Sequence, residues 1–166
     1  MKNLIYTALL FMGTHLSFGL KAQQSAGQPT CQPAMVQEQI DSLKRYYASH
    51  GFSLLREASM QMESQYEMPI IVPLTQGEWY SFVYVGHPES RLHEVRMYDY
   101  MEKMVVYRKN LRKDVAANVI NFTYEPTSSE YHIIKPVQVN NKQKDLCGYV
   151  MLFKRTDKST VSIRTQ

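Results

Sequence analysis

The stretch MPIIVPLTQGEWYSFVYV at residues 68–85 decides the fold of this chain. It contains two short apolar runs, residues 70–72 and 79–85, which are separated by Pro73, Gly77 and polar residues. Branched and aromatic side chains at this density, bounded by proline and glycine, predict two buried strands joined by a turn.

The second run is predicted to be a central strand of a β-sandwich. Alternation places three aromatic residues on one sheet face: Tyr80, Phe82 and Tyr84. The opposite face is expected to carry Trp79, Val83 and Val85. Because both faces are apolar, both are expected to be covered by other elements.

Further strands are predicted from alternation and short apolar runs on either side of this stretch. They are residues 58–62, 92–98, 104–107, 115–124, 131–139 and 146–153. Residues 109–114 are expected to form a charged loop. Short strands without helical crossovers indicate an antiparallel sandwich or barrel, and about eight of them suit a jelly roll. The predicted fold class is therefore all-β, an antiparallel jelly-roll-like β-sandwich with one N-terminal helix.

That helix is expected at residues 33–50. Its apolar residues recur at spacings of four, three and four and so share one face: Val36, Ile40, Leu43 and Tyr47. Pro33 suits the first helical position, and Gly51 is a natural stop. The apolar face must cover an open end or face of the sandwich.

Residues 1–22 have the outline of a secretory signal peptide, with Lys2 before an apolar segment and Ala22 at the expected cleavage edge. A retained transmembrane anchor is the alternative, but polar residues interrupt the apolar segment, which is too short to span well. We expect export to the periplasm or the extracellular space. Residues 23–32 are then a flexible leader, residues 33–156 a single domain and residues 157–166 a frayed tail.

The charge of the chain is modest once the signal peptide is removed. The full sequence has 19 basic and 15 acidic residues, and cleavage removes Lys2, Lys21 and no acid, which leaves 17 and 15 and a net charge of +2. The basic residues at 108–113 and 142–158 are interpreted as solvated loops or edge strands. Nucleic acid is therefore not an expected partner, nor is stable membrane insertion after cleavage.

The two cysteines, Cys31 and Cys147, both lie in the mature chain. An even count in an oxidising compartment is typical of a disulfide, which here would enclose 115 residues. Alternatively, Cys147 is a small buried apolar residue within a strand. Neither cysteine belongs to a C-x-x-C pair, and two thiols alone do not form a zinc site.

Twelve tyrosines are the most unusual feature of the composition. Four are expected in the core: Tyr80, Tyr84, Tyr124 and Tyr131. Others are expected to lie exposed: Tyr46, Tyr66, Tyr98, Tyr100 and Tyr107. An exposed tyrosine beside a sheet suits sugar stacking or a protein interface, or it covers a sheet edge. From these tyrosines and the loops at 86–91 and 99–103 we predict the binding residues His87, Arg91, Tyr98, Asp99, Tyr100 and Tyr107.

Groups suited to catalysis or metal binding are few. The spacing of His87 and His93 matches no standard zinc site, and an extended segment would point His93 and Glu94 to opposite faces. Asp99 is expected to act in a hairpin turn, with calcium binding as the alternative. The sequence has no G-x-S-x-G motif and no glycine-rich phosphate loop. Scattered glutamates leave a glycosidase-like carboxylate pair as an alternative, drawn from Glu78, Glu94, Glu125 and Glu130.

Three strand patterns follow one another within residues 70–135. They are Leu74-x-x-Gly77-x-x-Tyr80-x-Phe82, Val95-x-Met97-x-Asp99 with Val105 and Val106, and FTYEPTSSEYHI at residues 122–133. Their order resembles bacterial pre-peptidase C-terminal-like domains, although Ser129-Glu130 stand where that family has a glycine. The resemblance implies a jelly-roll sandwich in an exported, non-catalytic module that contacts carbohydrate or protein. In some members of that family calcium binds in the loops.

We therefore predict an exported, non-catalytic module that contacts glycan or protein at the cell envelope. No cofactor is expected other than the calcium that the resemblance leaves open. The alternatives are a small secreted hydrolase with a carboxylate pair and a structural or assembly subunit. Surface tyrosines would favour the binding module, paired carboxylates in a cleft the hydrolase, and a long uncovered edge strand the assembly subunit.

Overall fold

A computed structural model describes residue 31 and residues 34–156. The expected signal peptide at 1–22, the leader at 23–32 apart from Cys31, and the tail at 157–166 lie outside the described residues. The elements are the 3-10 turn η1 Ala34–Val36, α1 Gln37–Ser49, β1 Phe52–Glu63, β2 Ile70–Leu74, β3 Tyr80–Val85, β4 Leu92–Tyr98, β5 Met104–Leu111, β6 Val119–Tyr124, β7 Glu130–Val139 and β8 Asp145–Arg155.

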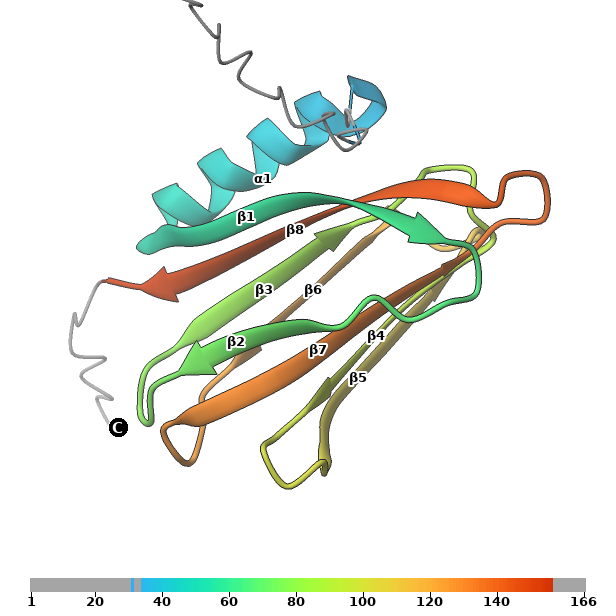
Figure 1. The fold of residues 1–166 in the computed structure, drawn as a ribbon. Coiled ribbons are helices and arrows are strands. Elements are labelled where there is room, and N and C mark those ends of the chain that lie inside the picture. The colour runs from blue at the N-terminus through green and yellow to red at the C-terminus, as the bar shows by residue number, and fades with distance from the viewer. Residues whose placement is uncertain (1–30, 32–33, 157–166) are drawn as a thin grey trace, which may run out of the picture.

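The strands form two facing four-stranded sheets with the orders β1-β8-β3-β6 and β2-β7-β4-β5 (Figure 1). β1 pairs with β8, β2 with β7, β3 with β6 and β4 with β5, always antiparallel. The chain is thus one long hairpin rolled into two layers, which is the jelly-roll topology. The predicted fold class is confirmed.

β3 lies between β8 and β6 in its sheet, and all of its residues are buried. Three of them pack in the core between the sheets: Tyr80, Phe82 and Tyr84. Val83 and Val85 face the other way and pack in a second apolar cluster beneath α1. The predicted central strand is confirmed for these residues. The prediction for Trp79 is wrong, because Trp79 precedes β3 and is 44% exposed.

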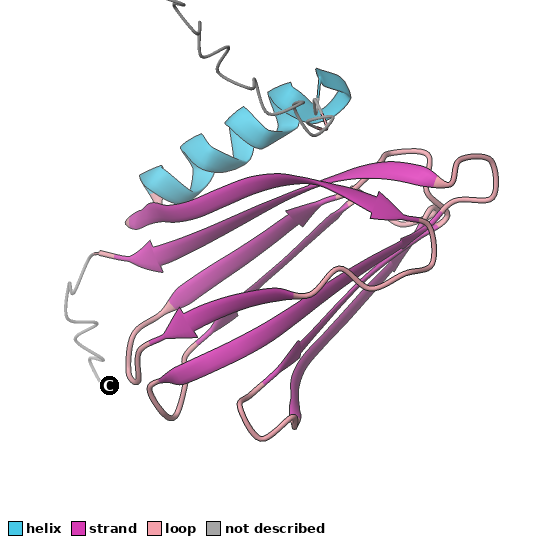
Figure 2. Ribbon diagram, viewed as in Figure 1, coloured by secondary structure: helices cyan, strands magenta, loops and turns pink. Residues whose placement is uncertain are grey.

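α1 covers the outer face of the β1-β8-β3-β6 sheet (Figures 1 and 2). Ile40 and Tyr47 are buried against this sheet, and the Tyr47 ring stacks on Phe153 with ring centroids 4.6 Å apart. Gly51 ends the helix with φ 76°, the left-handed conformation that glycine adopts readily. The predicted helix is confirmed, but its α-helical part is shorter than residues 33–50, since Ala34–Val36 form a 3-10 turn and Pro33 lies outside the described residues. Its apolar face covers a sheet face and not an end of the sandwich.

The outer face of the β2-β7-β4-β5 sheet is not covered by any element of the described chain (Figure 1). The sandwich therefore has one closed outer face and one open outer face. Among the described residues, the helices are too short or too polar to cross a membrane.

Several predicted strand boundaries are wrong. The strand predicted at 115–124 begins only at Val119, because Ala116 takes φ 51° and interrupts the extended backbone. The loop predicted at 109–114 is shorter, because β5 pairs with β4 as far as Leu111. The strand predicted at 58–62 is longer, because β1 pairs with β8 from Phe52 onward.

Candidate functional site

The structure does not bring all of the predicted binding residues together. His87 and Arg91 lie in the loop before β4, whereas Asp99 and Tyr100 lie in the hairpin after it. These loops are therefore at opposite ends of the sandwich (Figure 1). Tyr98 ends β4 and Tyr107 lies in β5, so both belong to the sheet between the two loops.

The hairpin after β4 is held by turn chemistry. The carboxylate of Asp99 accepts a hydrogen bond from the Lys103 backbone N–H at 2.9 Å, as predicted for a hairpin aspartate. Tyr100 is 71% exposed at the turn. In the described ranges, no three or more His, Cys, Asp or Glu side chains are grouped so that they could hold a metal ion.

The open outer face of the β2-β7-β4-β5 sheet is the candidate functional site. Val95, Met97 and Ile134 point into the core, so the residues between them on the same strands point outward. We define the open face by Glu67, Ile71, Pro73, Glu94, Arg96, Tyr98, Tyr107, Tyr131, Ile133 and Lys135.

The centre of the open face is an ion-pair network around Arg96. Its guanidinium contacts Glu94 and lies 2.9 Å from Glu67 Oε1. Lys135 Nζ lies 3.0 Å from the other Glu67 oxygen. Partial burial lowers the pKa of Arg96, but the charges of Glu94 and Glu67 outweigh it and raise that pKa. The network links charged side chains to one another on a face that otherwise carries tyrosine, isoleucine and proline side chains.

Two tyrosines contact this network, and a third lies farther along the same face. The Tyr107 hydroxyl donates to Glu94 Oε2 at 3.2 Å, and the Lys135 ammonium lies over the Tyr98 ring, 5.2 Å from its centroid. Desolvation and the negative charge of Glu94 raise the pKa of Tyr107, so its hydroxyl stays a donor. Tyr131 is 58% exposed and pairs with Pro73 of the neighbouring strand. The face thus offers flat rings beside fixed hydrogen-bonding groups.

Sequence reasoning found only part of the open face. Tyr98 and Tyr107 were predicted as binding residues, but the core position predicted for Tyr131 is wrong. In β7 both alternating sets contain apolar residues, so the sequence does not show which set faces out. Glu67 lies in the irregular segment before β2 and has no pattern that could have revealed it.

A buried histidine supports the loop before β4. His93 has no exposed surface, and its Nε2–H donates to the His87 carbonyl at 3.1 Å. A Cβ on Gly86 would lie 2.4 Å from His93 Cδ2, so only glycine leaves room for this ring. Glu94 points to the open face, which confirms the predicted opposition of His93 and Glu94.

Stability should fall in mild acid because of His93. Burial lowers the pKa of His93 below its ordinary value of 6.5. The unfolded chain therefore binds a proton where the folded chain does not, so stability is full above about pH 6.5 and falls as the pH drops towards the folded pKa. Urea unfolding at pH 7.5 and 5.5 should show a smaller loss in His93→Gln than in the wild type. An exposed-residue control, His50→Gln, should keep the wild-type loss, and an equal loss in all three proteins would contradict this assignment.

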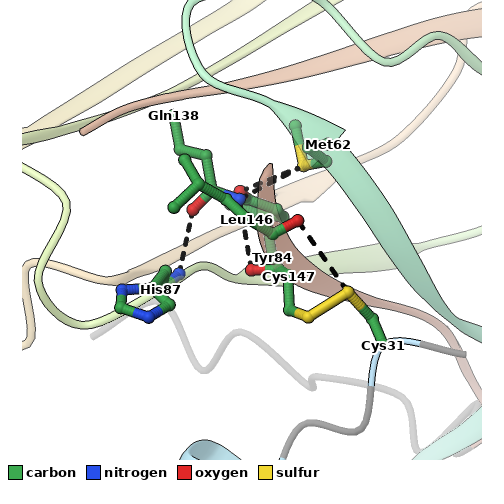
Figure 3. The surroundings of a disulfide bond; sticks show 7 residues. All are labelled: Cys31, Met62, Tyr84, His87, Gln138, Leu146 and Cys147. Carbon is green, nitrogen blue, oxygen red and sulfur yellow. Dashed lines mark hydrogen bonds between the residues drawn. A yellow bond between two sulfur atoms is a disulfide. The ribbon is translucent and has the colours of Figure 1, made fainter. Parts of the chain in front are cut away.

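A disulfide joins Cys31 to Cys147, with the Cα atoms 5.5 Å apart. This confirms pairing over the alternative of a free buried thiol. Figure 3 shows that fully buried Gln138 links this region to the loop before β4. Its Oε1 accepts from the His87 N–H at 2.9 Å, and its Nε2 donates to the Cys147 carbonyl at 3.1 Å. The disulfide and Gln138 therefore fix the loop that carries His87.

Three hollows lie away from the open face, beside α1 or at the end of the sandwich that carries the loop before β4. One of about 470 Å³ lies beside the disulfide and is lined in part by His87 and Lys144. Another of about 560 Å³ lies between α1 and β6. A third of about 390 Å³ lies between the β1–β2 and β7–β8 turns. Among the predicted binding residues, only His87 lines one of these three hollows.

No protein-family model and no curated protein matches the sequence. Solved structures with similar folds include one described as "CBM4 structure and function" (16% identity, 64% of this chain and 76% of that chain, TM-score 0.35). Dimeric latent PorU from Porphyromonas gingivalis is another (9%, 61% and 13%, TM-score 0.33). The Gap123 complex from Streptococcus agalactiae is a third (15%, 74% and 46%, TM-score 0.32). Similarities of this strength do not assign a function to the chain.

Proposed function

We propose that this chain is an exported, non-catalytic module that binds a glycan of the cell envelope on the open face. One observation carries the proposal: the sheet face that the described chain leaves uncovered presents Tyr98 and Tyr107 against an ion-pair network and Tyr131 farther along the same face. The resemblance to pre-peptidase C-terminal-like domains agrees with this proposal and stays a prediction.

The chemistry of the face favours a saccharide over a protein partner. Tyrosine rings offer flat apolar surface to the C–H faces of a sugar, and their hydroxyls offer polar contacts. Ion-paired Arg, Lys and Glu side chains have donors and acceptors left over, so they can also hydrogen-bond to sugar hydroxyls while they keep their ion pairs. The core of a protein interface is depleted of charged residues, whereas the centre of this face is Arg96 between Glu67 and Glu94.

The same network argues for binding without catalysis. A glycosidase needs one carboxyl group as a proton donor and a second as nucleophile or base. Here both carboxylates of the face contact Arg96, and Glu67 also pairs with Lys135. We infer that these carboxylates position the cationic side chains and do not act on a glycosidic bond.

Export is supported by the disulfide. Disulfides form and persist mainly in oxidising compartments outside the cytosol. The Cys31–Cys147 bond joins the segment before the N-terminal helix to β8. The periplasm or the extracellular space is therefore the proposed location, in agreement with the signal peptide expected at residues 1–22.

Assembly through an edge strand is the second candidate function. β1 is a 12-residue strand at the edge of its sheet, and Leu55 in it is 48% exposed. A free strand edge can pair with a strand of another chain. However, the register of β1 shifts between Leu54 and Arg56, and such irregularities discourage edge pairing. The open face is therefore the preferred site.

Affinity electrophoresis tests the proposal. We expect native gels that contain xylan, β-1,3-glucan or α-mannan to retard the wild-type protein in at least one case. In that gel, Tyr107→Ala and Tyr131→Ala should each weaken binding about tenfold, because each removes a ring that the ligand stacks on.

The matched control is Tyr46→Ala. Tyr46 is 55% exposed, nearly as much as Tyr131, but it lies on α1 on the other side of the molecule. This variant should bind like the wild type. The proposal fails if no polysaccharide retards the protein, or if Tyr46→Ala weakens binding as much as the face variants.

A further inference from the structure

The open face borders a cluster of cations at one end of its sheet. β5 pairs with β4 so that Lys109 lies opposite Glu94. Side chains directly opposite each other in an antiparallel pair lie on the same face, so Lys109 points outward beside the open face. Tyr107 precedes it by two positions in β5 and shares this direction. A ligand on the tyrosines of the open face therefore lies next to a lysine.

Two arginines lie just beyond the paired residues of β4 and β5. The Arg112 N–H donates to the Arg91 carbonyl at 3.0 Å. This main-chain bond holds the two residues side by side, at the end of the sandwich that carries the loop before β4 (Figure 1). Lys113 follows Arg112 directly. We define the basic end as Arg91, Lys109, Arg112 and Lys113.

The basic end has no carboxylate that neutralises it. All four of its side chains are exposed, and none of them forms an ion pair within the described part of the chain. Asp114 follows it in sequence, and its Oδ2 accepts from the Leu111 N–H at 2.6 Å. The network around Arg96, by contrast, contains two cations and two carboxylates and is neutral. The positive charge is therefore concentrated at one end of the sheet.

Protection of an edge strand explains only part of this cluster. A lysine on an edge strand discourages pairing with another chain, which suits Lys109 in β5. Arg91 and Arg112 lie outside β4 and β5 and have no strand edge to protect. The sequence predicted solvated loops or edge strands for residues 108–113, but it did not show that Arg91 joins them from a second loop. Adjacent like charges repel each other, so the cluster favours an anionic ligand.

We propose that the glycan bound on the open face is acidic, and that its sulfate or carboxylate groups pair with the basic end while its sugar rings lie against Tyr107. The inference rests on the proposed function and adds the chemical class of the glycan. An arginine guanidinium can pair with such an oxyanion through two parallel hydrogen bonds. Tyr107 and Arg112 are five positions apart, roughly 17 Å along an extended chain, so a ligand that contacts both is an oligosaccharide or longer and not a single anion.

Matched polysaccharides test the charge of the ligand. The β-1,3-glucan and α-mannan of the affinity gels are neutral, and each is compared with its sulfated and its carboxymethylated derivative at about 0.15 M salt. We expect at least one acidic derivative to bind about tenfold more tightly than its neutral parent, and the difference to shrink at about 1 M salt, which screens the charges. Neutral parents that bind as tightly as their derivatives, with weaker binding in Tyr107→Ala, would overturn this inference and leave the proposed function standing. No retardation by any of the polymers would overturn both.

Matched double variants locate the charges that bind the acidic polymer. Arg91→Gln/Arg112→Gln should weaken its binding about tenfold or more, and the turn is kept because the two residues are joined by a main-chain bond. Arg45→Gln/Lys142→Gln removes the same charge at two other exposed positions and should bind like the wild type. An equal loss in both double variants would mean that net charge attracts the polymer, which overturns the inference. Vesicles of anionic phospholipid that bind more tightly than the acidic polysaccharides, with binding lost in the arginine variant, would assign the basic end to a membrane surface and would also overturn it.

Discussion

Removal of the disulfide should lower the free energy of unfolding by about 4 kcal/mol. Cys31 and Cys147 are 116 positions apart in the sequence, so their bond restricts almost the whole described domain in its unfolded state. The loss of such a long closed loop raises the entropy of the unfolded chain by close to the largest amount expected for a single disulfide. Few single-site changes in a domain of this size have an effect as large.

Urea unfolding of Cys31→Ser/Cys147→Ser against the oxidised wild type measures this effect. The m-value should also rise, because an unfolded chain without the crosslink exposes more surface. Wild-type protein unfolded with excess dithiothreitol should match the double variant and is the control for the substitutions themselves. An unchanged midpoint in the double variant would show that the disulfide does not stabilise the folded state.

Phe82→Ala should cost about 3–5 kcal/mol of stability. Phe82 is 3% exposed at the centre of the core between the sheets. Its ring packs against Phe122, with centroids 5.4 Å apart. Truncation would leave a cavity between two sheets that are each held by their own hydrogen bonds and cannot close around it.

Trp79→Ala is the matched comparison three positions earlier. Tryptophan is larger than phenylalanine, but Trp79 is 44% exposed and lies outside β3. Its truncation should cost less than about 1 kcal/mol. Chemical denaturation of both variants gives the two values. A larger loss in Trp79→Ala than in Phe82→Ala would mean that the core is not organised around β3 as described.

The jelly roll was predictable because local patterns and topology agree in this chain. Segments with period-two alternation, separated by turn residues and without helical crossovers, leave few folds other than a sandwich. The face of α1 was equally clear from the spacing of Ile40, Leu43 and Tyr47. The strand boundaries were less so. Residues 115–118 are Val, Ala, Ala and Asn, of which only Val favours a strand, and the backbone turns at Ala116, so the composition did carry a signal against a strand here.

The candidate site was predictable only in part, for a related reason. Tyr98 and Tyr107 lie in strands with clear alternation, so their outward-facing positions could be foreseen, but Tyr98 is half-buried and not exposed as predicted. Tyr131 lies in β7, where residues of both parities are apolar, and its outward position depends on the register with β2 and β4. Glu67 and Lys135 form an ion pair although they lie far apart in the sequence. No local pattern contains such a contact.

The open face of the β2-β7-β4-β5 sheet is the proposed glycan-binding surface. NMR titration of the wild-type protein with an oligosaccharide of the polysaccharide that retards it tests this most directly. We expect the largest signal changes at Arg96, Tyr98, Tyr107, Tyr131 and Lys135, which form one contiguous surface. Changes confined to the outer side of α1 or to the free edge of β1, with none on the open face, would show that the glycan binds elsewhere.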